Sequence, residues 1–532
     1  MKWYYSLFLA ALVVACAETR QCEQCIYYSD YGAVGNGKTD DFDAIIKAHE
    51  AANKAGLPVR ANTGATYYIG GADKTAQIQT DTDWGNAKFI IDDRNVENRN
   101  SSIFSISSKL PSERITTVTT LKKNQEKLDL SLQHNSIIVV ADNTTMRYMR
   151  EGTRVGVDID NGSPQTDVFI VDKNGNVDMK TPIILDFNNI SSMIAYPIDA
   201  ETLTIKGGHF TTIANQAESQ STYYSRNISI RRSNVVVDGI YHAVTGEGYY
   251  GAPYIGFIEA ENCADVLVQN CMLSGRYTYM TIGSDNMTAE MGEYNSIYLN
   301  ANSVNAIEME SYDISLNGTA NITFKNCKQI NDIHNTKLWG IIAADHSKNL
   351  TFDSVEFSNF NARKGVTNAT IKNSVMGWKS VEIMGGGLLL VENTKICGSN
   401  FVTLRHDYGS TWDGEIIIRN CEFAPRNGAQ SDAVLIFGIY SGQHNFGYTC
   451  HMPRKITIDG LVINDGNPIE DYQGPKIFAP FNRAYANEAY KEKYPYAITE
   501  EVEISNLTIK SEKPLIVSAN QFMFRNVKIT EK

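Results

Sequence analysis

Residues 320–327 read ANITFKNC, a short alternating apolar run that ends in a polar turn. Variants of this phrase recur at 348–355 (KNLTFDSV), 367–374 (TNATIKNS), 388–394 (LLLVENT) and 415–421 (EIIIRNC). Their turn positions, Asn326, Ser354, Asn373, Asn393 and Asn420, are 28, 19, 20 and 27 residues apart. A strand-length run that returns every 20 to 30 residues or so predicts a solenoid whose coils stack on one continuous core.

The same phrase occurs on both sides of this stretch, so the repeat covers roughly 300 residues. It returns at 227–233, 265–271, 455–459, 506–509 and 524–529. Cys271, Cys327 and Cys421 occupy one position of the phrase, which is typical of small apolar side chains stacked inside a solenoid. The recurring asparagines are interpreted as turn residues whose side chains satisfy the backbone at bends.

Composition bounds the function. The 532 residues are 42% hydrophobic, enough for a large interior, and carry a formal net charge of -12. An acidic chain disfavours nonspecific nucleic-acid binding, so no nucleic acid is expected as a partner. An anionic saccharide is still compatible with this charge, because a local basic cluster can dominate the field around it.

The N-terminus predicts an exported protein. Lys2 precedes an apolar run at 3–15 that is too short to span a bilayer. Residues 12–16 (LVVAC) resemble a bacterial lipobox, which implies a mature chain that begins at lipidated Cys16 and is anchored to a membrane. We therefore expect an outer-membrane lipoprotein, at the cell surface or in the periplasm. Ordinary signal cleavage within 15–17 is the alternative.

Residues 30–41 (DYGAVGNGKTDD) form a glycine-rich loop before an expected helix. Gly56 and Pro58 end this helix. Four apolar residues and one histidine share one of its faces: Phe42, Ile45, Ile46, Ala52 and His49. His49 on this face is interpreted as packed rather than catalytic. A phosphate-binding loop is not expected, because no apolar strand precedes the glycine-rich loop.

This loop, the helix and the strand-like run at 65–69 resemble the opening of pectate-lyase-superfamily proteins. The resemblance implies an all-β fold, a right-handed single-stranded parallel β-helix (solenoid) with an N-terminal capping helix. We expect a signal peptide at 1–15, the lipobox Cys, a linker and the cap helix at 16–60, and the β-helix at 61–532. A small β insertion is expected at about 110–190 and a loop insertion at about 466–500.

Alignment of the coils places six segments on one sheet, with alternate side chains facing outward. These segments are 254–259, 312–316, 339–344, 380–384, 401–406 and 433–437. The candidate catalytic residues are the polar residues along this row and the turn beside it: Asp313, Asp345, Arg363, Arg405, His406 and Asp407. The candidate substrate-binding residues are the neighbouring polar and aromatic ones: Glu259, Tyr250, Tyr254, Trp339, Lys364, Glu382, Tyr408 and Trp412.

These residue types suit saccharide chemistry, and three hypotheses follow. Paired carboxylates can cleave a glycosidic bond as acid and base, so a glycoside hydrolase acting on a complex polysaccharide is the leading hypothesis. A polysaccharide lyase would use Arg, Lys or His on a uronate, with Ca²⁺ as a possible cofactor. A non-catalytic glycan-binding surface protein is the third. No other cofactor or metal is expected, and the oligomeric state is open.

The resemblance does not extend to catalytic motifs. Polygalacturonase-like hydrolases carry Asn-Thr-Asp, Asp-Asp, Gly-His-Gly and Arg-Ile-Lys, and none of these occurs in the matching coils. Pectate lyases carry Trp-Ile-Asp-His, of which residues 343–346 (AADH) match only the last half. The resemblance therefore indicates fold and a carbohydrate role, but it does not assign the reaction.

Overall fold

The computed structural model describes residues 24–71, 73–98, 100–151, 158, 160–215, 223–247, 254–275, 278–282, 306–310, 313–336, 341–438, 442–479, 493–494, 496–517 and 524–529. Within them, α1 (Phe42–Ala55) is the single α-helix and almost everything else regular is strand. One pairing network joins 32 strands, and its neighbours run parallel. The predicted all-β fold, a right-handed parallel β-helix, is thereby confirmed.

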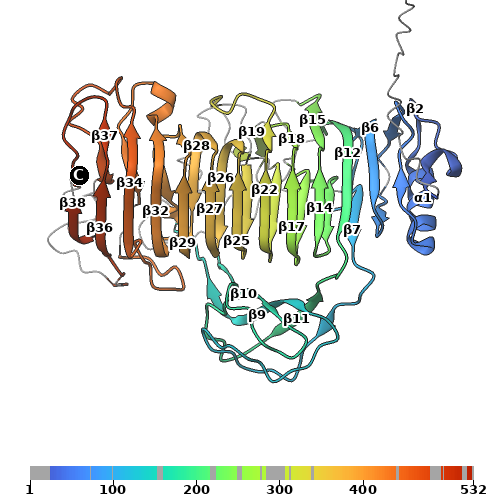
Figure 1. Ribbon diagram of the computed structural model, residues 1–532, viewed down its shortest axis with the longest axis horizontal. Coiled ribbons are helices and arrows are strands. Elements are labelled where there is room, and N and C mark those ends of the chain that lie inside the picture. The colour runs from blue at the N-terminus through green and yellow to red at the C-terminus, as the bar shows by residue number, and fades with distance from the viewer. Residues whose placement is uncertain are drawn as a thin grey trace, which may run out of the picture.

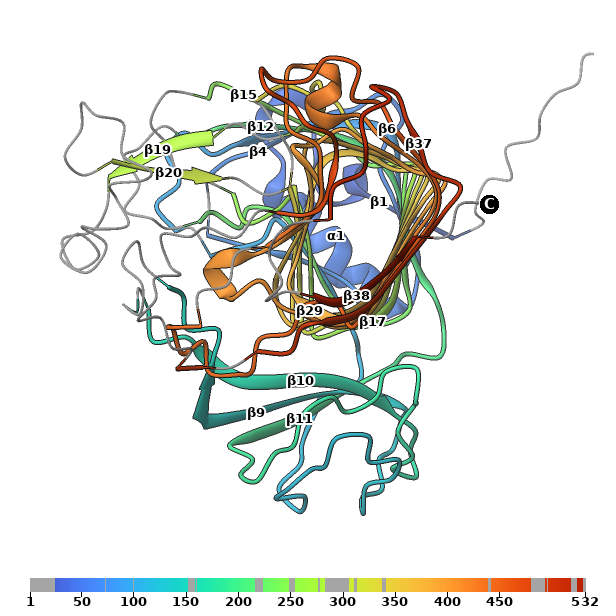
Figure 2. The same cartoon turned by 90° about the vertical axis from the view of Figure 1, so that its left-hand side faces the viewer.

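Each coil contributes in turn to three parallel sheets, which surround one elongated core (Figures 1 and 2). Sheet 1 contains β1 (Ile26–Tyr27), β3 (Val59–Arg60), β14 (Val235–Asp238), β17 (Ala264–Gln269), β22 (Ala320–Lys325), β25 (Lys348–Asp353), β27 (Val366–Lys372), β29 (Gly385–Glu392), β36 (Thr499–Ser505) and β38 (Phe524–Ile529). Sheet 2 contains β2 (Asn36–Asp40), β4 (Thr66–Ile69), β15 (Tyr241–Thr245), β18 (Met272–Leu273), β23 (Lys328–Gln329), β30 (Lys395–Ile396) and β37 (Thr508–Ile509).

Sheet 3 is the sheet on which the sequence placed the candidate site. It contains β5 (Ala76–Ile78), β7 (Phe104–Ser107), β13 (Ile228–Arg231), β16 (Ile258–Glu261), β21 (Ile314–Asn317), β24 (Ile341–Asp345), β31 (Asn400–Leu404), β33 (Val434–Phe437) and β35 (Lys476–Phe478). Long strands bend from sheet 1 into sheet 2: β6 (Thr82–Asp92), β12 (Leu203–Ile213), β32 (Trp412–Phe423) and β34 (Lys455–Ile463). Two others bend from sheet 2 into sheet 3: β26 (Glu356–Lys364) and β28 (Val375–Ile383).

The repeated phrase forms sheet 1, and its alternate residues point inward. Ile322 and Phe324 of β22 lie opposite Leu350 and Phe352 of β25, and all four are buried. The two phenyl rings stack 5.3 Å apart at 6°. Full burial of each such side chain contributes about 1.5–3 kcal/mol, so these inward columns supply much of the stability of the solenoid.

The asparagine turns have the backbone conformation that a sharp bend requires. The φ angles of the five anchor residues Asn326, Ser354, Asn373, Asn393 and Asn420 are 52°, 58°, 53°, 48° and 50°. Asparagine tolerates this left-handed region better than most residues. The Asn393 amide also donates to Asn373 Oδ1 at 3.3 Å, so the turns are linked from coil to coil.

Helix α1 covers the N-terminal end of the solenoid (Figure 1). Its buried face carries Phe42, Ile45 and His49, which confirms that His49 is a packed residue. The Asp41 carboxylate accepts from the backbone N–H of Val34 at 2.6 Å and of Gly35 at 3.1 Å, and so holds the glycine-rich loop against the helix start.

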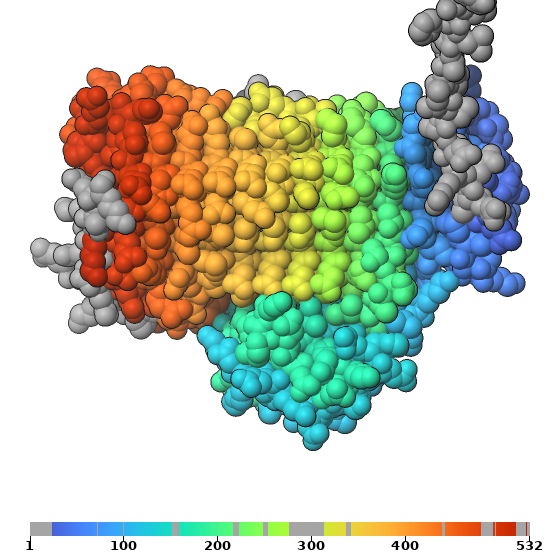
Figure 3. Space-filling model, in the orientation of Figure 1, coloured from blue at the N-terminus to red at the C-terminus, as the bar shows by residue number. Residues whose placement is uncertain are grey.

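Between β7 and β12 the chain leaves the solenoid and forms a four-stranded antiparallel sheet. Its order is β10 (Ser163–Val171), β9 (Ser136–Arg147), β11 (Ser192–Pro197) and β8 (Glu113–Arg114). Figure 3 shows this insertion packed against the side of the central coils. Lys348 of β25 and Asp167 of β10 form an ion pair at 2.7 Å that is almost fully buried in the junction. A second, two-stranded antiparallel sheet pairs β19 (Thr278–Ile282) with β20 (Ala306–Glu310).

One further observation bears on the export prediction. Cys25 is disulfide-bonded, whereas the six cysteines of the described solenoid are free and buried. Across the residues that the structure describes, no helix combines the length and the apolar character needed to cross a membrane.

Candidate functional site

The register of sheet 3 lines up one outward residue from each successive coil. Glu259 pairs with Ser315, Ser315 with Ala343, Ala343 with Asn361, Asn361 with Glu382, and Glu382 with Thr403. Successive positions in such a row are about 4.8 Å apart. The expectation that these segments lie side by side on one sheet is confirmed by this pairing.

A cleft of about 310 Å³ opens over the later part of this row. It is lined by Asn361, Trp378, Lys379, Glu382, Ser399, Asn400, Thr403, Arg405, His406, Asp407 and Phe437. Of the candidate residues from the sequence, it brings together Glu382, Arg405, His406 and Asp407. The last three follow β31, where the chain leaves the sheet through a short 3₁₀ turn at His406–Tyr408.

Arg405 and Asp407 form a two-pronged ion pair at the edge of the cleft. Arg405 Nε donates to Asp407 Oδ1 at 3.1 Å, and a terminal nitrogen donates to Oδ2 at 2.6 Å. Arg150, from the insertion, reaches the same carboxylate at 3.1 Å. Burial opposes ionisation of Asp407, but Arg405 outweighs it, and the pKa of this carboxyl lies well below its ordinary value. Asp407 is therefore a fixed negative charge.

Glu382 is the second carboxylate of the cleft, and its surroundings differ. Its Oε2 accepts from the side-chain amides of Asn361 at 3.1 Å and Asn359 at 3.4 Å. Among the described residues it forms no ion pair. Asn361 also accepts from Arg405 at 2.8 Å, so one amide connects the two carboxylate groups.

The remaining lining supplies an aromatic surface and cations. Trp378 is half-buried, and the Lys379 ammonium lies 6.0 Å from its ring centre. His406 is exposed at the mouth. A half-buried indole beside hydrogen-bonding groups can stack on a sugar ring. The described residues contain no cluster of three or more His, Cys, Asp or Glu placed to hold a metal ion.

Four other candidates lie beside the cleft or upstream of it. Arg363 donates to both oxygens of Asp345, at 3.2 and 3.0 Å. Lys364 donates to Ser163 Oγ of the insertion at 2.8 Å, so this side chain links the solenoid to the insertion. Glu259 lies four coils before Glu382 in the row, and burial raises the pKa of its carboxyl. A glycan that followed the row would cover about 19 Å between these two glutamates.

The structure corrects four expectations, because these side chains lie in the interior. Trp412 is fully buried, since strand alternation turns it into the core. Asp313 is also buried, at 1% exposure. Tyr408 lies beneath the Arg405 guanidinium, 5.0 Å from its ring centre. Tyr254 donates from its hydroxyl to Asp93, at 3.1 Å.

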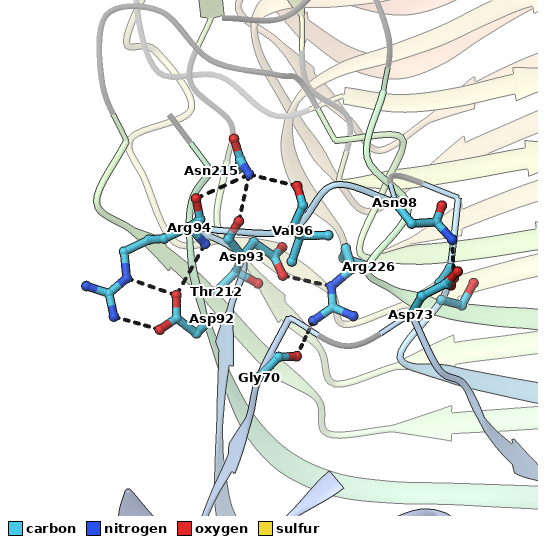
Figure 4. A network of polar contacts seen from close by, with 12 residues as sticks. Gly70, Asp73, Asp92, Asp93, Arg94, Val96, Asn98, Thr212, Asn215 and Arg226 are labelled. Atoms are coloured by element: carbon cyan, nitrogen blue, oxygen red, sulfur yellow. Dashed lines mark hydrogen bonds and ion pairs between the residues drawn. The ribbon is translucent and has the colours of Figure 1, made fainter. Parts of the chain in front are cut away.

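Tyr254 therefore belongs to a buried polar network in the early coils rather than to a substrate surface. Asp93 and Arg226 form an ion pair at 2.8 Å with no exposed side-chain surface, and Arg226 also donates to the Gly70 carbonyl (Figure 4). Asn215 donates to the Asp93 carbonyl at 2.7 Å. Tyr250, Trp339 and Cys16, which the sequence also singled out, lie outside the described residues.

Sequence reasoning missed Arg150, Asn361 and Trp378. The period-two pattern of β26 places Asn361 outward between Ala343 and Glu382, so a complete coil alignment would have found it. Trp378 lies within β28 next to the bend, where alternation is interrupted between Phe357 and Asn359 of the neighbouring strand. Arg150 reaches the cleft from the insertion, and no local pattern signals that contact.

Comparisons with known proteins add little to this description. No family model and no curated protein matches the sequence. Solved structures that resemble it include the Pseudomonas phage phi297 tailspike gp61, at 12% identity over 93% of this chain and 84% of that chain, with a TM-score of 0.46. The gp54 tailspike of Acinetobacter baumannii bacteriophage AP22, in complex with capsular saccharide, is 11% identical over 95% and 76%, with a TM-score of 0.42.

The Yersinia enterocolitica family 28 exopolygalacturonase is 10% identical over 96% of this chain and 78% of that chain, with a TM-score of 0.35. Likenesses at this level do not bear on the activity of the present chain.

Proposed function

We propose that the cleft binds and cleaves a complex polysaccharide, and that the protein is a glycoside hydrolase. The observation that carries this proposal is the pair of carboxylates, Glu382 and Asp407, in one cleft but in contrasting surroundings. Neutral amides surround Glu382, whereas two guanidinium groups hold Asp407 ionised. Such a division suits one carboxylic acid that donates a proton and one carboxylate that stays ionised during glycosidic cleavage.

The roles follow from these partners. Glu382 donates its proton to the glycosidic oxygen as the bond from that oxygen to the sugar carbon breaks, and the resulting carboxylate then takes a proton from the water that attacks this carbon. Asp407 keeps its negative charge and faces the positive charge that develops on the sugar ring. Trp378 stacks on a neighbouring sugar, and Asn361 fixes the distance between the two carboxylates through its bonds to Glu382 and Arg405.

A lyase is the second candidate, and one observation favours it. Arg405, His406 and Lys379 line the same cleft, and His406 is exposed enough to take a proton from a bound sugar. These cations, or Ca²⁺, would neutralise a uronate carboxylate during elimination. A non-catalytic glycan-binding role would use the same surface without bond cleavage.

The test is incubation of the purified protein with plant, algal and host glycans, with reducing ends and absorbance near 235 nm both recorded. A hydrolase releases reducing ends without absorbance, and Glu382→Gln or Asp407→Asn should lower turnover by about 10²-fold or more. Glu415→Gln, a matched change on exposed sheet 1, should have no effect. Products that absorb ultraviolet light would contradict the hydrolase and favour the lyase. Binding of a glycan without any product would contradict both enzymes.

We further propose export and anchoring through a lipid on Cys16. The disulfide at Cys25 supports an oxidising compartment, because such bonds rarely persist in a reducing cytosol. Labelling with a fatty-acid analogue should mark the wild type and fail for Cys16→Ala. Label retained on the variant, or none on the wild type, would exclude the anchor.

A further inference from the structure

A second cavity, of about 430 Å³, lies between the insertion and the solenoid. The insertion supplies Lys123, Arg147 and Tyr148 to its wall. The solenoid supplies the bend at 384–387 and the loop at 448–454. Its volume is within the range of small-ligand sites, which run from roughly 300 to 1,000 Å³.

The cavity concentrates positive charge in an acidic protein. Lys123, Arg147 and Arg454 line it, and no ion pair joins any of their side chains to a described residue. The one carboxylate of the lining, Asp413, lies 3.7 Å from His451. Three cations thus face one carboxylate and one histidine.

Among the three cations, Arg147 gives the strongest indication of an anion site. It is half-buried, and its Nε donates to Gln165 at 2.7 Å, while neither terminal nitrogen hydrogen-bonds to a described residue. Burial lowers the pKa of its guanidinium. Asp167, the nearby carboxylate, is already paired with Lys348. A cation that is partly removed from water without a counter-ion costs free energy, which an anionic ligand would recover.

The walls suit a sugar ring. The bend at Gly385, Gly386 and Gly387 presents bare backbone, and an added Cβ would lie 1.9 Å from the Val366 carbonyl oxygen at the first and 2.5 Å from that of Asp413 at the second. Tyr148 forms an aromatic cluster with Tyr448, whose ring centre is 5.4 Å away. Aromatic rings that line a cavity can pack against a sugar ring.

We propose that this cavity is a second saccharide site, selective for a sugar unit that carries a carboxylate or sulfate group. Both groups accept paired hydrogen bonds from guanidinium, and this shared chemistry defines the ligand. The negative charge of the ligand is inferred from the cavity itself. Its being a saccharide rests on the proposed function.

The cavity adjoins the cleft. Tyr148 and Met384, which line the cavity, pack with Tyr408, whose neighbour Asp407 lines the cleft. One cluster of packed side chains therefore connects the two sites. The cavity would hold an acidic unit or branch of the polysaccharide while the cleft acts on a neighbouring linkage.

The test is calorimetric titration of the full-length protein with a triuronate, a sulfated trisaccharide, a neutral trisaccharide and inorganic sulfate. At low salt, at least one acidic trisaccharide should bind about tenfold or more tightly than the neutral one. Arg147→Gln and Arg454→Gln should each weaken that binding about tenfold. Arg454 is exposed, so its variant tests the site without disturbing packing. Lys173→Gln, the same charge change on an exposed turn of the insertion, is the matched control.

Equal binding of neutral and acidic trisaccharides would overturn the inference, and so would affinities within twofold of wild type in both arginine variants. Sulfate that binds as tightly as either trisaccharide would overturn the saccharide part. Failure of the proposed function looks different: no glycan is cleaved, yet the acidic trisaccharide still binds Glu382→Gln and loses affinity in Arg454→Gln.

Discussion

The N-terminal cap should make the protein sensitive to acid through one residue, His49. Its ring is fully buried beneath α1, and Nε2 lies 2.9 Å from the Tyr28 hydroxyl. Trp84 Nε1 donates to the same hydroxyl at 2.8 Å, which leaves the Tyr28 proton free to be donated to His49. His49 is thus held as a neutral acceptor, and none of the described carboxylates forms an ion pair with its ring.

The magnitude follows from the pKa. Burial lowers the pKa of His49 from 6.5 to about 3. Between these values the unfolded chain binds a proton that the native cap does not, so the free energy of unfolding falls as the pH falls. The stabilisation is complete above pH 6.5. Relative to neutral pH, the loss from this group is about 2 kcal/mol at pH 5 and about 4 kcal/mol at pH 3.

The measurement is urea unfolding of wild type and His49→Gln between pH 7 and pH 5, followed by tryptophan fluorescence, because Trp84 lies in the same cluster. Glutamine keeps an acceptor but does not titrate. The difference in unfolding free energy between the two proteins should shrink by about 2 kcal/mol over this range. Exposed His134→Gln should leave the pH profile of the wild type unchanged. A wild-type-minus-variant difference that stayed constant with pH would refute the reasoning.

Three other substitutions test the junction, the turns and the cleft. Lys348→Met should destabilise the insertion by about 3–5 kcal/mol, because it leaves the buried Asp167 carboxylate without its ion-pair partner. Adding Asp167→Leu to this variant should restore much of the lost stability, as measured by proteolysis and urea unfolding. An equal loss of stability in the single and the double variant would contradict the ion-pair argument. Asn393→Ala should lower the thermal midpoint by an amount equivalent to about 1–2 kcal/mol and Asn393→Gly by less, since glycine accepts φ of 48°; identical midpoints would count against a left-handed turn. Trp378→Ala should weaken oligosaccharide binding about tenfold in calorimetry while Trp378→Phe retains most of it, and an unchanged affinity would remove the stacking role.

The solenoid was predictable because its signals are local and repeated. Apolar and polar residues alternate along the strands with period two. The turns at Asn326, Asn373 and Asn393 have a left-handed backbone, which asparagine adopts more readily than most residues. The same alternation placed Glu382 on an outward row that the strand pairing reproduces. Every coil repeats the same strand and turn pattern, so an atypical residue in one coil does not change the prediction for the others.

The site was harder to predict, because contacts between distant segments decide it. Trp412 has polar neighbours in sequence, but it begins a strand whose first residue points inward. Tyr408 was drawn into the core by packing with Tyr148 of the insertion. Arg150 completes the clamp on Asp407 only because the insertion folds back on the solenoid.

The position of the insertion also constrains how the first coils assemble. β6 ends at Asp92, and β12, its hydrogen-bonded neighbour, begins at Leu203. If the insertion forms first, with its antiparallel strands close in sequence, its two ends come together before the coils pair. The loop to be closed then shrinks from about 110 to about 20 flexible residues, which lowers the entropic cost of joining β6 to β12 by about 1.5 kcal/mol. Pulse-labelled hydrogen exchange during refolding should therefore protect β9 and β10 before β12. Besides lining the second cavity, the insertion would hold its two chain ends together, so that the stacking of coils continues past it.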